Sequence, residues 1–449
     1  MNYKKFIHYF KKNKNRIEII NNKKKITFSD ILNFKEKYFN CKKKVFLLFS
    51  NDYFETIFLY SSLLISENII ILIDFIDDNN YLKLIIKKYK PNYVILPNKK
   101  FLNLNIACKK IHSLKKNNIF QLVDNKKISY NIENKLLLST SGTTGSPKMV
   151  QLSEKNLLSN AESICSYLKI IKEDSCITTL SPSYSYGLSI INSHLLKGAK
   201  IFINQLNIAN HNFWKFVQLN KINSISFIPA QLEILAKYNF FNKKLNSIKY
   251  MTSAGGKLQE NVINFLKKFC EKRGILFYVM YGQTEASPRI SYYKLNKTNL
   301  GHNCIGKPIN KGKLMISGKN KIGEIIYSGP NIYLGYAENH LDLKKKISVK
   351  KKLNTGDIGY KDQHDNFYVL ERKKRIAKIN GLRISLDHLE EIFKKKNIVT
   401  NCYSVSDKIS IYTKNSKFKN YINNYLKNIL HLNKDNYSFI SKQIKVRKK

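Results

Sequence analysis

The stretch LLLSTSGTTGSPKMV, residues 136–150, is an apolar run that ends abruptly in hydroxyl side chains, two glycines, a proline and one lysine. Its apolar start predicts the end of a buried strand, and Ser153, followed by apolar residues at helical spacing, predicts the N-cap of a helix. Glycines let backbone amides turn toward one point, and hydroxyl and ammonium groups add further donors. The loop between strand and helix is therefore suited to cradle a polyphosphate.

Two interpretations of this loop stay open on composition alone. Clusters of Ser, Thr and Gly are most often ordinary surface turns. The loop also differs from a Walker phosphate loop, because Pro147 precedes Lys148 and no Gly-Lys-Ser/Thr sequence runs directly into a helix. If the loop does bind phosphate, the candidate groups belong to Thr140, Ser141, Gly142, Thr143, Thr144, Gly145 and Lys148.

Strands and helices alternate on both sides of the loop, which predicts an α/β fold with an open, mostly parallel sheet flanked by helices. The segments that carry this alternation lie at 45–51, 54–65, 68–75, 93–97, 224–235 and 248–274. Nearer the N-terminus, residues 17–30 predict a strand pair that enters a helix capped near Ser29.

Length and cysteine content narrow the class of protein. A chain of 449 residues with 43% hydrophobic residues predicts two or three structural units. The seven cysteines are scattered and form no C-x-x-C pair, which favours a reducing cytoplasm over a disulfide framework or a zinc site. The N-terminus lacks the apolar core of a signal peptide, and the most apolar span, 57–76, is broken by Glu67 and Asp74. We therefore expect neither an export signal nor a membrane span.

The net charge of +48 suggests a nucleic-acid partner, but the type of basic residue argues against one. Only seven of the 79 basic residues are arginine, and the lysines are spread along the chain together with many asparagines and isoleucines. These three residue types share A/T-rich codons, so we hypothesise that a skewed genome set the composition. A strand-binding groove would need basic residues gathered with interleaved aromatics. We expect no specific nucleic-acid partner.

Several segments together resemble the adenylate-forming superfamily, which contains acyl- and aryl-CoA synthetases, the adenylation domains of peptide synthetases, and luciferases. Four motifs stand in the order of that family: STSGTTGSPK (139–148), YGQTE (281–285), TGD (355–357) and the segment 367–391. SAGG (253–256) precedes the second motif, and the resemblance as a whole covers about residues 26–391. The resemblance implies a large N-terminal domain at 1–370, made of helix-flanked sheets and a small β-rich subdomain. It also implies a small, hinged α+β domain at 371–449, which is shorter than usual.

The resemblance assigns a nucleotide site to the phosphate-loop residues named above and to Gly255, Tyr281, Gly282, Thr284, Asp357 and Arg372. In that family pattern Tyr281 stacks on adenine, Thr284 contacts the α-phosphate and Glu285 binds magnesium. Asp357 and Arg372 contact the ribose. The residue types suit these roles, because a flat aromatic ring fits a purine and a hard cation prefers carboxylate oxygen.

The same resemblance implies an acyl pocket and a thiol channel. Tyr184, Phe227, Ser253 and Gly255 are the expected substrate contacts, and Gly381 lies at the thiol channel beyond a pivot near Lys374. Family members that activate amino acids usually place an aspartate near Tyr184, since a buried ammonium needs an anion. No carboxylate occurs between residues 176 and 197, which disfavours an α-amino acid substrate.

Some positions depart from the family pattern. Met149 stands where glycine is usual, Leu386 where proline is usual, and His388 where glutamate is usual. The usual C-terminal Gly-Lys loop is missing, so Lys442 or Lys445 would have to supply its lysine. With Lys445 in that role, the expected catalytic residues are Thr140, Lys148, Glu285 and Lys445.

The implied reaction is ATP-dependent activation of a carboxylic acid as an acyl-adenylate, followed by acyl transfer to a thiol. ATP, Mg²⁺ and either coenzyme A or a phosphopantetheine-bearing acyl-carrier protein are the expected cofactors and partners, besides a small carboxylic acid. Two alternatives stay open. One is an amino-acid-adenylating enzyme, and the other is a degenerate family member that binds ATP or AMP without full catalysis.

The interpretation of charge predicts weak, salt-sensitive binding to polyanions. The protein should bind a heparin column at low ionic strength and elute at modest salt, because spread lysines neutralise few phosphates at a time. The salt concentration at which the protein elutes from the column measures this, together with a duplex-DNA binding assay. Tight duplex binding that persists at high salt would contradict the interpretation.

Overall fold

The computed structural model describes most of the 449-residue chain. The described residues are 5–21, 24–97, 106–123, 133–139, 148–238, 245–295, 300, 303–318, 321–345, 352–372, 376–379, 382–394, 396–405, 407–413 and 415–441. The central part of the phosphate-loop segment, 140–147, lies outside them, as do Lys374, Gly381, Lys442 and Lys445.

The first of two large sheets contains thirteen strands in the described part of the chain. Strands β10 to β14, with β1, form its parallel centre, and antiparallel strands extend both ends. Their order is β17 (Lys313–Ile316), β18 (Ile322–Ser328), β20 (Leu353–Lys361), β21 (Phe367–Arg372), β16 (Cys304–Pro308), β15 (Arg289–Lys294), β14 (Leu276–Gly282), β13 (Tyr250–Ser253), β12 (Ser224–Phe227), β10 (Ser175–Thr178), β11 (Lys200–Ile203), β1 (Glu18–Ile20) and β2 (Lys25–Thr27).

The second sheet has eight described strands around the parallel set β3, β4, β5 and β8. Their order is β19 (Gly335–Ala337), β9 (Met149–Leu152), β8 (Leu136–Ser139), β4 (Ile69–Asp74), β3 (Val45–Ser50), β5 (Tyr93–Pro97), β7 (Asn117–Leu122) and β6 (Cys108–Ser113). Strand β3 is apolar on both faces, as expected for a parallel strand covered on two sides.

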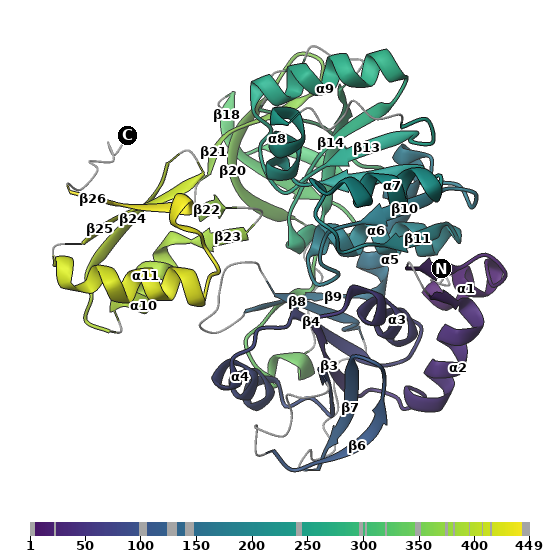
Figure 1. Ribbon diagram of the computed structural model, residues 1–449. Coiled ribbons are helices and arrows are strands. Elements are labelled where there is room, and N and C mark those ends of the chain that lie inside the picture. The colour runs from purple at the N-terminus through teal and green to yellow at the C-terminus, as the bar shows by residue number, and fades with distance from the viewer. Residues whose placement is uncertain are drawn as a thin grey trace.

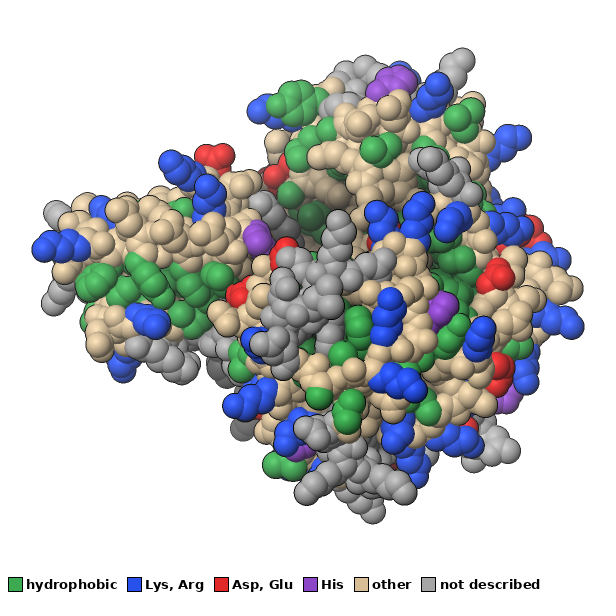
Figure 2. All heavy atoms as spheres, turned by 60° about the horizontal axis from the view of Figure 1, so that its bottom comes forward, with side chains coloured by type: hydrophobic (Ala, Val, Ile, Leu, Met, Phe, Trp, Pro, Cys, Tyr) green, Lys and Arg blue, Asp and Glu red, His purple; other side chains and the backbone are tan. Residues whose placement is uncertain are grey.

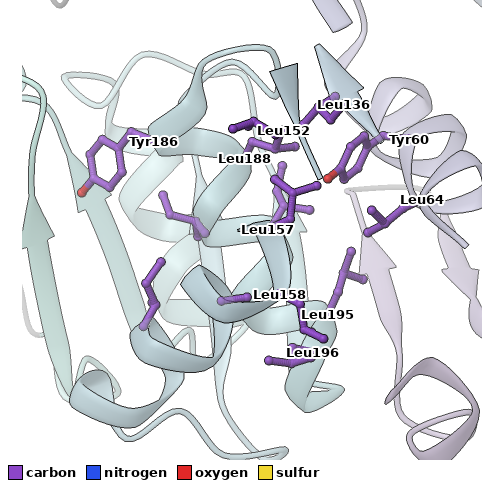
Figure 3. Close-up of a cluster of buried hydrophobic side chains, with 14 of the residues drawn as sticks. Tyr60, Leu64, Leu136, Leu152, Leu157, Leu158, Tyr186, Leu188, Leu195 and Leu196 are labelled. Atoms are coloured by element: carbon purple, nitrogen blue, oxygen red, sulfur yellow. The ribbon is translucent and has the colours of Figure 1, made fainter. Parts of the chain in front are cut away.

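Helices form a layer between the two sheets. Helices α3 (Tyr53–Leu64), α5 (Glu154–Leu168) and α6 (Ser185–Lys197) join apolar side chains of both sheets in one core. Figure 3 shows part of this layer, where Leu64 of α3 faces Leu195 and Leu196 of α6. The buried hydroxyl of Tyr60 on α3 donates to Asn192 of α6 at 3.0 Å, so one buried polar contact also joins these two helices.

The outer faces of the sheets are covered by other helices. Helices α7 (His211–Leu219), α8 (Pro229–Lys237) and α9 (Glu260–Arg273) pack on the first sheet, and α4 (Asn79–Tyr89) packs on the second (Figure 1). Near the N-terminus, α1 (Phe6–Lys12) and α2 (Phe28–Tyr38) extend the middle layer. The short 3₁₀ turns are η3 (Thr284–Ala286), η5 (Asp342–Lys344), η6 (Ser416–Phe418) and η7 (Lys434–Asn436).

The C-terminal residues form a separate core (Figure 1). Strands β22 (Ile376–Ile379) and β23 (Leu382–Ser385) pair with each other, and β24 (Thr400–Val405), β25 (Lys408–Thr413) and β26 (Tyr437–Ile440) form a three-stranded sheet. Helices α10 (Leu386–Lys394) and α11 (Lys419–Asn428) cover them. The domain boundary between residues 370 and 371 stays a prediction, and β21 runs across it within the large sheet.

The α/β fold expected from the sequence is confirmed by this architecture, with two local corrections. Helix α2 is capped by Thr27 rather than near Ser29, because the Thr27 hydroxyl accepts the amide of Asp30 at 3.3 Å. Strand β9 intervenes between the phosphate-loop segment and helix α5 and pairs with β8, so the chain does not pass from that segment straight into a helix.

Lysine and arginine side chains are scattered over the face seen in Figure 2 rather than gathered in one stripe. The most apolar span of the sequence, 57–76, consists of the end of α3, a turn and strand β4. Within the described residues, no helix is both long and apolar enough to cross a lipid bilayer. All seven cysteine thiols are free, and five of them are buried.

Lys135, directly before β8, predicts a measurable stability effect. Its ammonium group is buried and donates to the carbonyls of Leu63, Ser66 and Asn68 at 2.8, 2.6 and 3.1 Å. A Lys135→Met variant should be less stable by about 2–4 kcal/mol at pH 7, because three buried acceptors lose a charged donor. Urea unfolding followed by circular dichroism measures this, and exposed Lys155→Met is the control.

The wild type and the Lys135→Met variant also test a pH effect. Burial lowers the pKa of Lys135 from 10.5 to about 8, so between these values the unfolded chain binds more protons than the folded one. The free energy of unfolding of the wild type should therefore rise relative to that of Lys135→Met as pH increases above about 8, by roughly 1.4 kcal/mol per pH unit. A difference that stays constant from pH 7 to 9.5 would contradict this assignment.

Candidate functional site

The candidate site lies where strands of both sheets end. Asp74 is the last residue of β4, and its carboxylate accepts the hydroxyl of Ser181, which follows β10, at 2.6 Å. The carboxyl ends of parallel strands in the two sheets therefore meet, and such edges are where open α/β sheets bind ligands. The phosphate-loop segment begins at this edge, since β8 is hydrogen-bonded to β4 and ends at Ser139.

A cavity of about 380 Å³ opens beside the first sheet, next to the C-terminal residues. We call it the central cavity. The residues that matter for its chemistry are Gly256, Lys257, Tyr281, Asp357, Lys378 and Asp407. Two of these come from the C-terminal core region, so the cavity wall combines the large sheet with the segment beyond residue 375.

Tyr281 and Asp357 form one wall of the central cavity. Tyr281 lies near the end of β14, and its hydroxyl donates to the carboxylate of Asp357 on β20. Asp357 is 2% exposed, and its neighbour in the β20–β21 ladder is Arg372. An aromatic ring beside a buried carboxylate suits a nucleoside, because the ring can stack on a base and the carboxylate can accept from two hydroxyls.

A glycine turn brings the backbone close to Tyr184. Gly255 has a φ of +88°, and a Cβ atom placed there would lie 2.3 Å from the hydroxyl oxygen of Tyr184. Tyr184 is the N-cap of helix α6. Ser253, at the end of β13, is 1% exposed, and its hydroxyl has no hydrogen-bond partner among the described residues. Three of the four expected acyl contacts thus lie around one turn.

Tyr336 joins a carboxylate to a lysine at the other end of the site. Its hydroxyl donates to Glu285 Oε1 at 2.8 Å, and Lys148 Nζ lies 4.2 Å from the centre of its ring. Lys148 also lies 3.6 Å from a carboxylate oxygen of Glu338. Burial and the neighbouring Glu285 raise the pKa of Tyr336, so its phenol stays a donor. Glu285 and Lys148 therefore lie on two sides of one ring.

Thr284 contacts the start of helix α6. Its hydroxyl lies 3.1 Å from the hydroxyl of Ser185. Thr284 therefore follows Tyr281 closely in sequence and also contacts helix α6, whose N-cap is Tyr184. The nearby Gly282 has a packing reason, because a Cβ atom there would lie 1.8 Å from the carbonyl oxygen of Pro288. Its glycine identity follows from that backbone crossing whether or not a nucleotide binds.

The expected site residues fall into three groups. The structure brings together Lys148, Thr284 and Glu285 on one side, and Tyr281, Asp357, Tyr184, Ser253 and Gly255 around the central cavity and its rim. Phe227 is fully buried among apolar side chains under α8, so its expected substrate contact is a core contact instead. Outside the described residues, or described only by backbone in the case of Arg372, lie Thr140, Ser141, Gly142, Thr143, Thr144, Gly145, Gly381 and Lys445.

Two site features escaped the sequence argument. Asp74 comes from β4, a hundred residues before the bend that holds Ser181 and Ser183, yet both serine hydroxyls donate to it. Its signal was a carboxylate at the end of a parallel strand. Tyr336 was hidden among many tyrosines. Met149, which replaces a usual glycine, is fully buried in β9 and pairs with Ala337 of β19.

No group of three or more His, Cys, Asp or Glu side chains in the described residues could enclose a metal ion. A single carboxylate such as Glu285 nevertheless fits Mg²⁺ that arrives with a nucleotide, since Mg²⁺ is usually held by one or two carboxylates together with phosphate oxygens and water.

Comparison with known proteins gives the same picture. A sequence model of AMP-binding enzymes matches residues 133–337. The chain is 29% identical over 268 residues to a 2-succinylbenzoate–CoA ligase of Bacillus cereus, covering 57% of this chain and 53% of the relative. It is 26% identical over 267 residues to a luciferin 4-monooxygenase of Nipponoluciola cruciata, covering 57% and 48%. The chain thus matches about half the length of these curated relatives.

Solved structures share the fold along almost the whole chain. A double mutant of o-succinylbenzoate CoA synthetase from Bacillus subtilis, bound with a product analogue, has a TM-score of 0.76 at 17% identity and covers 98% of this chain and 95% of its own. The same synthetase in complex with ATP and magnesium ion has a TM-score of 0.67 at 17% identity, covering 97% and 95%. Residues 133–337 are thus similar in sequence to AMP-binding enzymes, and nearly the whole chain shares the fold of the solved synthetase.

Proposed function

We propose that this chain is an ATP-dependent carboxylate-activating ligase, which forms an acyl-adenylate and transfers the acyl group to a thiol. The observation that carries the proposal is the convergence of separate segments on one edge. Tyr281 and Asp357 line the central cavity, while Glu285 and Lys148 flank Tyr336 beside the phosphate-loop segment. Relatives that are CoA ligases, and a neighbour solved with ATP and magnesium ion, support the same reaction.

In this proposal the nucleotide lies along that edge. Adenine stacks on Tyr281, and Asp357 with Arg372 accepts and donates hydrogen bonds at the ribose. The α-phosphate lies near Thr284. Loop residues 140–145 and Lys148 hold the pyrophosphate, because amide, hydroxyl and ammonium donors neutralise its charge. Glu285 would hold Mg²⁺, which supplies charge neutralisation between phosphate oxygens when bound.

The first step joins an acid to AMP. A carboxylate oxygen of the acid attacks the α-phosphorus, the new C–O–P bond forms, and the bond to the β,γ-pyrophosphate breaks with the electron pair leaving on pyrophosphate. This displacement needs little covalent help, so the protein contributes positions and charges. Tyr184, Ser253 and Gly255 would hold the acid, with Thr284 and Ser185 at its reacting end.

The second step moves the acyl group to sulfur. The thiolate attacks the acyl carbon and AMP leaves with its phosphate oxygen. Coenzyme A or a phosphopantetheine carrier would supply the thiol, in a cytoplasm that keeps the seven cysteines reduced. Rotation of a small domain, residues 371–449, about a pivot near Lys374 would bring Gly381 to the thiol channel. Lys445 would supply the ammonium group that the usual Gly-Lys loop provides.

One observation favours an amino acid as the second candidate substrate. Asp74 reaches the bend before Tyr184 and is solvent-exposed, so it could pair with an ammonium group on the substrate. The two serine hydroxyls that donate to Asp74 partly satisfy it without a substrate. A carboxylic acid without an α-amino group therefore remains the first candidate substrate, and amino acids should be included in every substrate panel.

Acid-dependent exchange of labelled pyrophosphate into ATP tests the proposal. The wild-type protein with Mg²⁺ should exchange pyrophosphate only when a suitable acid is added, and coenzyme A should then release AMP. Glu285→Gln should lower kcat by roughly 10²–10³-fold, because a charge that stabilises the transition state is lost. Asp357→Ala should raise the KM for ATP by roughly 10–100-fold, because a charged hydrogen bond is lost.

The matched control is Asp365→Asn. Asp365 lies on the same β20–β21 hairpin as Asp357, but its side chain is 70% exposed and pairs only with Lys361 among the described residues. This variant should keep wild-type kinetics. ATP binding without exchange for any fatty, aryl, short or amino acid would instead make the chain a nucleotide-binding protein.

The glycine turn predicts a separable effect on the acid. Gly255→Ala should raise the KM for the acid, because its new methyl group collides with the Tyr184 hydroxyl. It should also destabilise the fold by about 1–2 kcal/mol, because the positive φ is strained for any residue with a Cβ atom. Adding Tyr184→Phe should restore the KM but not the stability, and a double variant with unchanged acid KM would refute this contact.

A further inference from the structure

Arg289, the first residue of β15, is a buried cation that the proposed reaction does not use. It is 2% exposed, and its Nη2 donates to the hydroxyl of Ser189 on α6 at 3.1 Å. The guanidinium carbon lies 4.9 Å from the centre of the Tyr186 ring. Its Nε has no hydrogen-bond partner among the described residues.

The charge on Arg289 is not balanced by a carboxylate. A guanidinium stays protonated at any pH that a protein meets. No acidic side chain in the described part of the chain forms an ion pair with it, and burial raises the pKa of Tyr186 to about 12 and that of Tyr167 further, so neither phenol supplies the charge. An unpaired buried charge is costly, and a contact with an aromatic face offsets only part of this. The site therefore favours an anion.

A small void lies against the guanidinium, with a volume of about 10 Å³. Its polar lining includes Arg289, Ser189, Ser193, His194, Ser226 and Thr252. Burial lowers the pKa of His194 to about 4, so its ring is neutral at physiological pH. The lining thus combines one cation with hydroxyl groups and holds no carboxylate. One wall is the flexible thioether of Met280, which can move aside for a group larger than water.

The void lies about one helical turn from the proposed reaction centre. Ser185 and Ser189 stand four residues apart on α6, and such residues share one face of a helix about 5–6 Å apart. Ser185 contacts Thr284, near the α-phosphate in the proposed reaction, while Ser189 contacts Arg289. An acid that reacts beside Thr284 and runs along this face of α6 would reach the guanidinium.

We propose that the Arg289 void binds a second carboxylate of the substrate, so that the activated acid is a short dicarboxylic acid. This inference rests on the proposed function, because it assigns the far end of the same acyl pocket. Arg289 and Ser189 select the substrate by its remote charge and take no part in the bond changes. A monocarboxylic acid of equal length would leave the guanidinium buried without an anion.

Chain-matched acids test the inference. In pyrophosphate exchange, succinate, glutarate or adipate should give a kcat/KM at least ~100-fold above butyrate, valerate or hexanoate respectively, because a site built for a polar group rejects analogues that lack it. Arg289→Leu should reverse this ratio toward the monocarboxylic acids, and Arg289→Lys should retain part of it. Arg273→Leu, which changes an exposed arginine at the end of α9, should leave the ratio unchanged.

If Arg289→Leu fails to fold, Ser189→Ala should still lower the dicarboxylate preference in pyrophosphate exchange.

A thermal-shift measurement without ATP separates this inference from the proposed ligase function. Glutarate should raise the Tm of the wild-type protein more than valerate, even if no acid supports exchange; that result would remove the proposed ligase and keep the anion site. Exchange with monocarboxylic acids only, equal shifts with glutarate, valerate and sodium chloride, or no effect of any acid in either assay would overturn the dicarboxylate inference.

Discussion

The helix layer between the two sheets is the contact on which the site depends. Helices α3, α5 and α6 bury apolar side chains against both sheets at once, and a fully buried leucine contributes about 1.5–3 kcal/mol. Because the same layer touches both sheets, it fixes where their carboxyl ends meet. Asp74 of one sheet and Ser181 after a strand of the other lie within hydrogen-bond distance only under that arrangement. The polar site is thus a result of apolar packing.

Within the site, electrostatics follow from a few shared groups. Tyr336 serves Glu285 through its hydroxyl and Lys148 through its ring face, so one side chain contacts both charges without neutralising either. Asp357 and Tyr281 are paired in a similar way, because the hydroxyl of Tyr281 donates to Asp357 at the wall of the central cavity. These pairs fix donors and acceptors in position without a ligand, and in the proposed reaction such preorganisation is the main contribution that the protein would make to the displacement.

Sequence reasoning predicted the local pieces of the fold and much less of their meeting points. Runs such as 45–51 and 93–97 specify strands by themselves, because parallel strands are apolar on both faces. Ser153 was identified as an N-cap because capping is a local interaction. Strand β9 was missed, since four residues after a loop carry too little pattern to distinguish a strand from a helix start. Asp74 and Arg289 were missed for another reason: their partners are remote in sequence, and neither belongs to a motif.

Strand β19 has a mechanical consequence. Its neighbours in sequence, β18 and β20, belong to the first sheet, whereas β19 pairs with β9 in the second. The segment that contains Tyr336 therefore links the two sheets covalently. If one sheet slid past the other, this segment would be pulled, and Tyr336 would move away from Glu285 or Lys148. Geometry at the phosphate end is in this way mechanically coupled to the alignment of the two halves of the molecule.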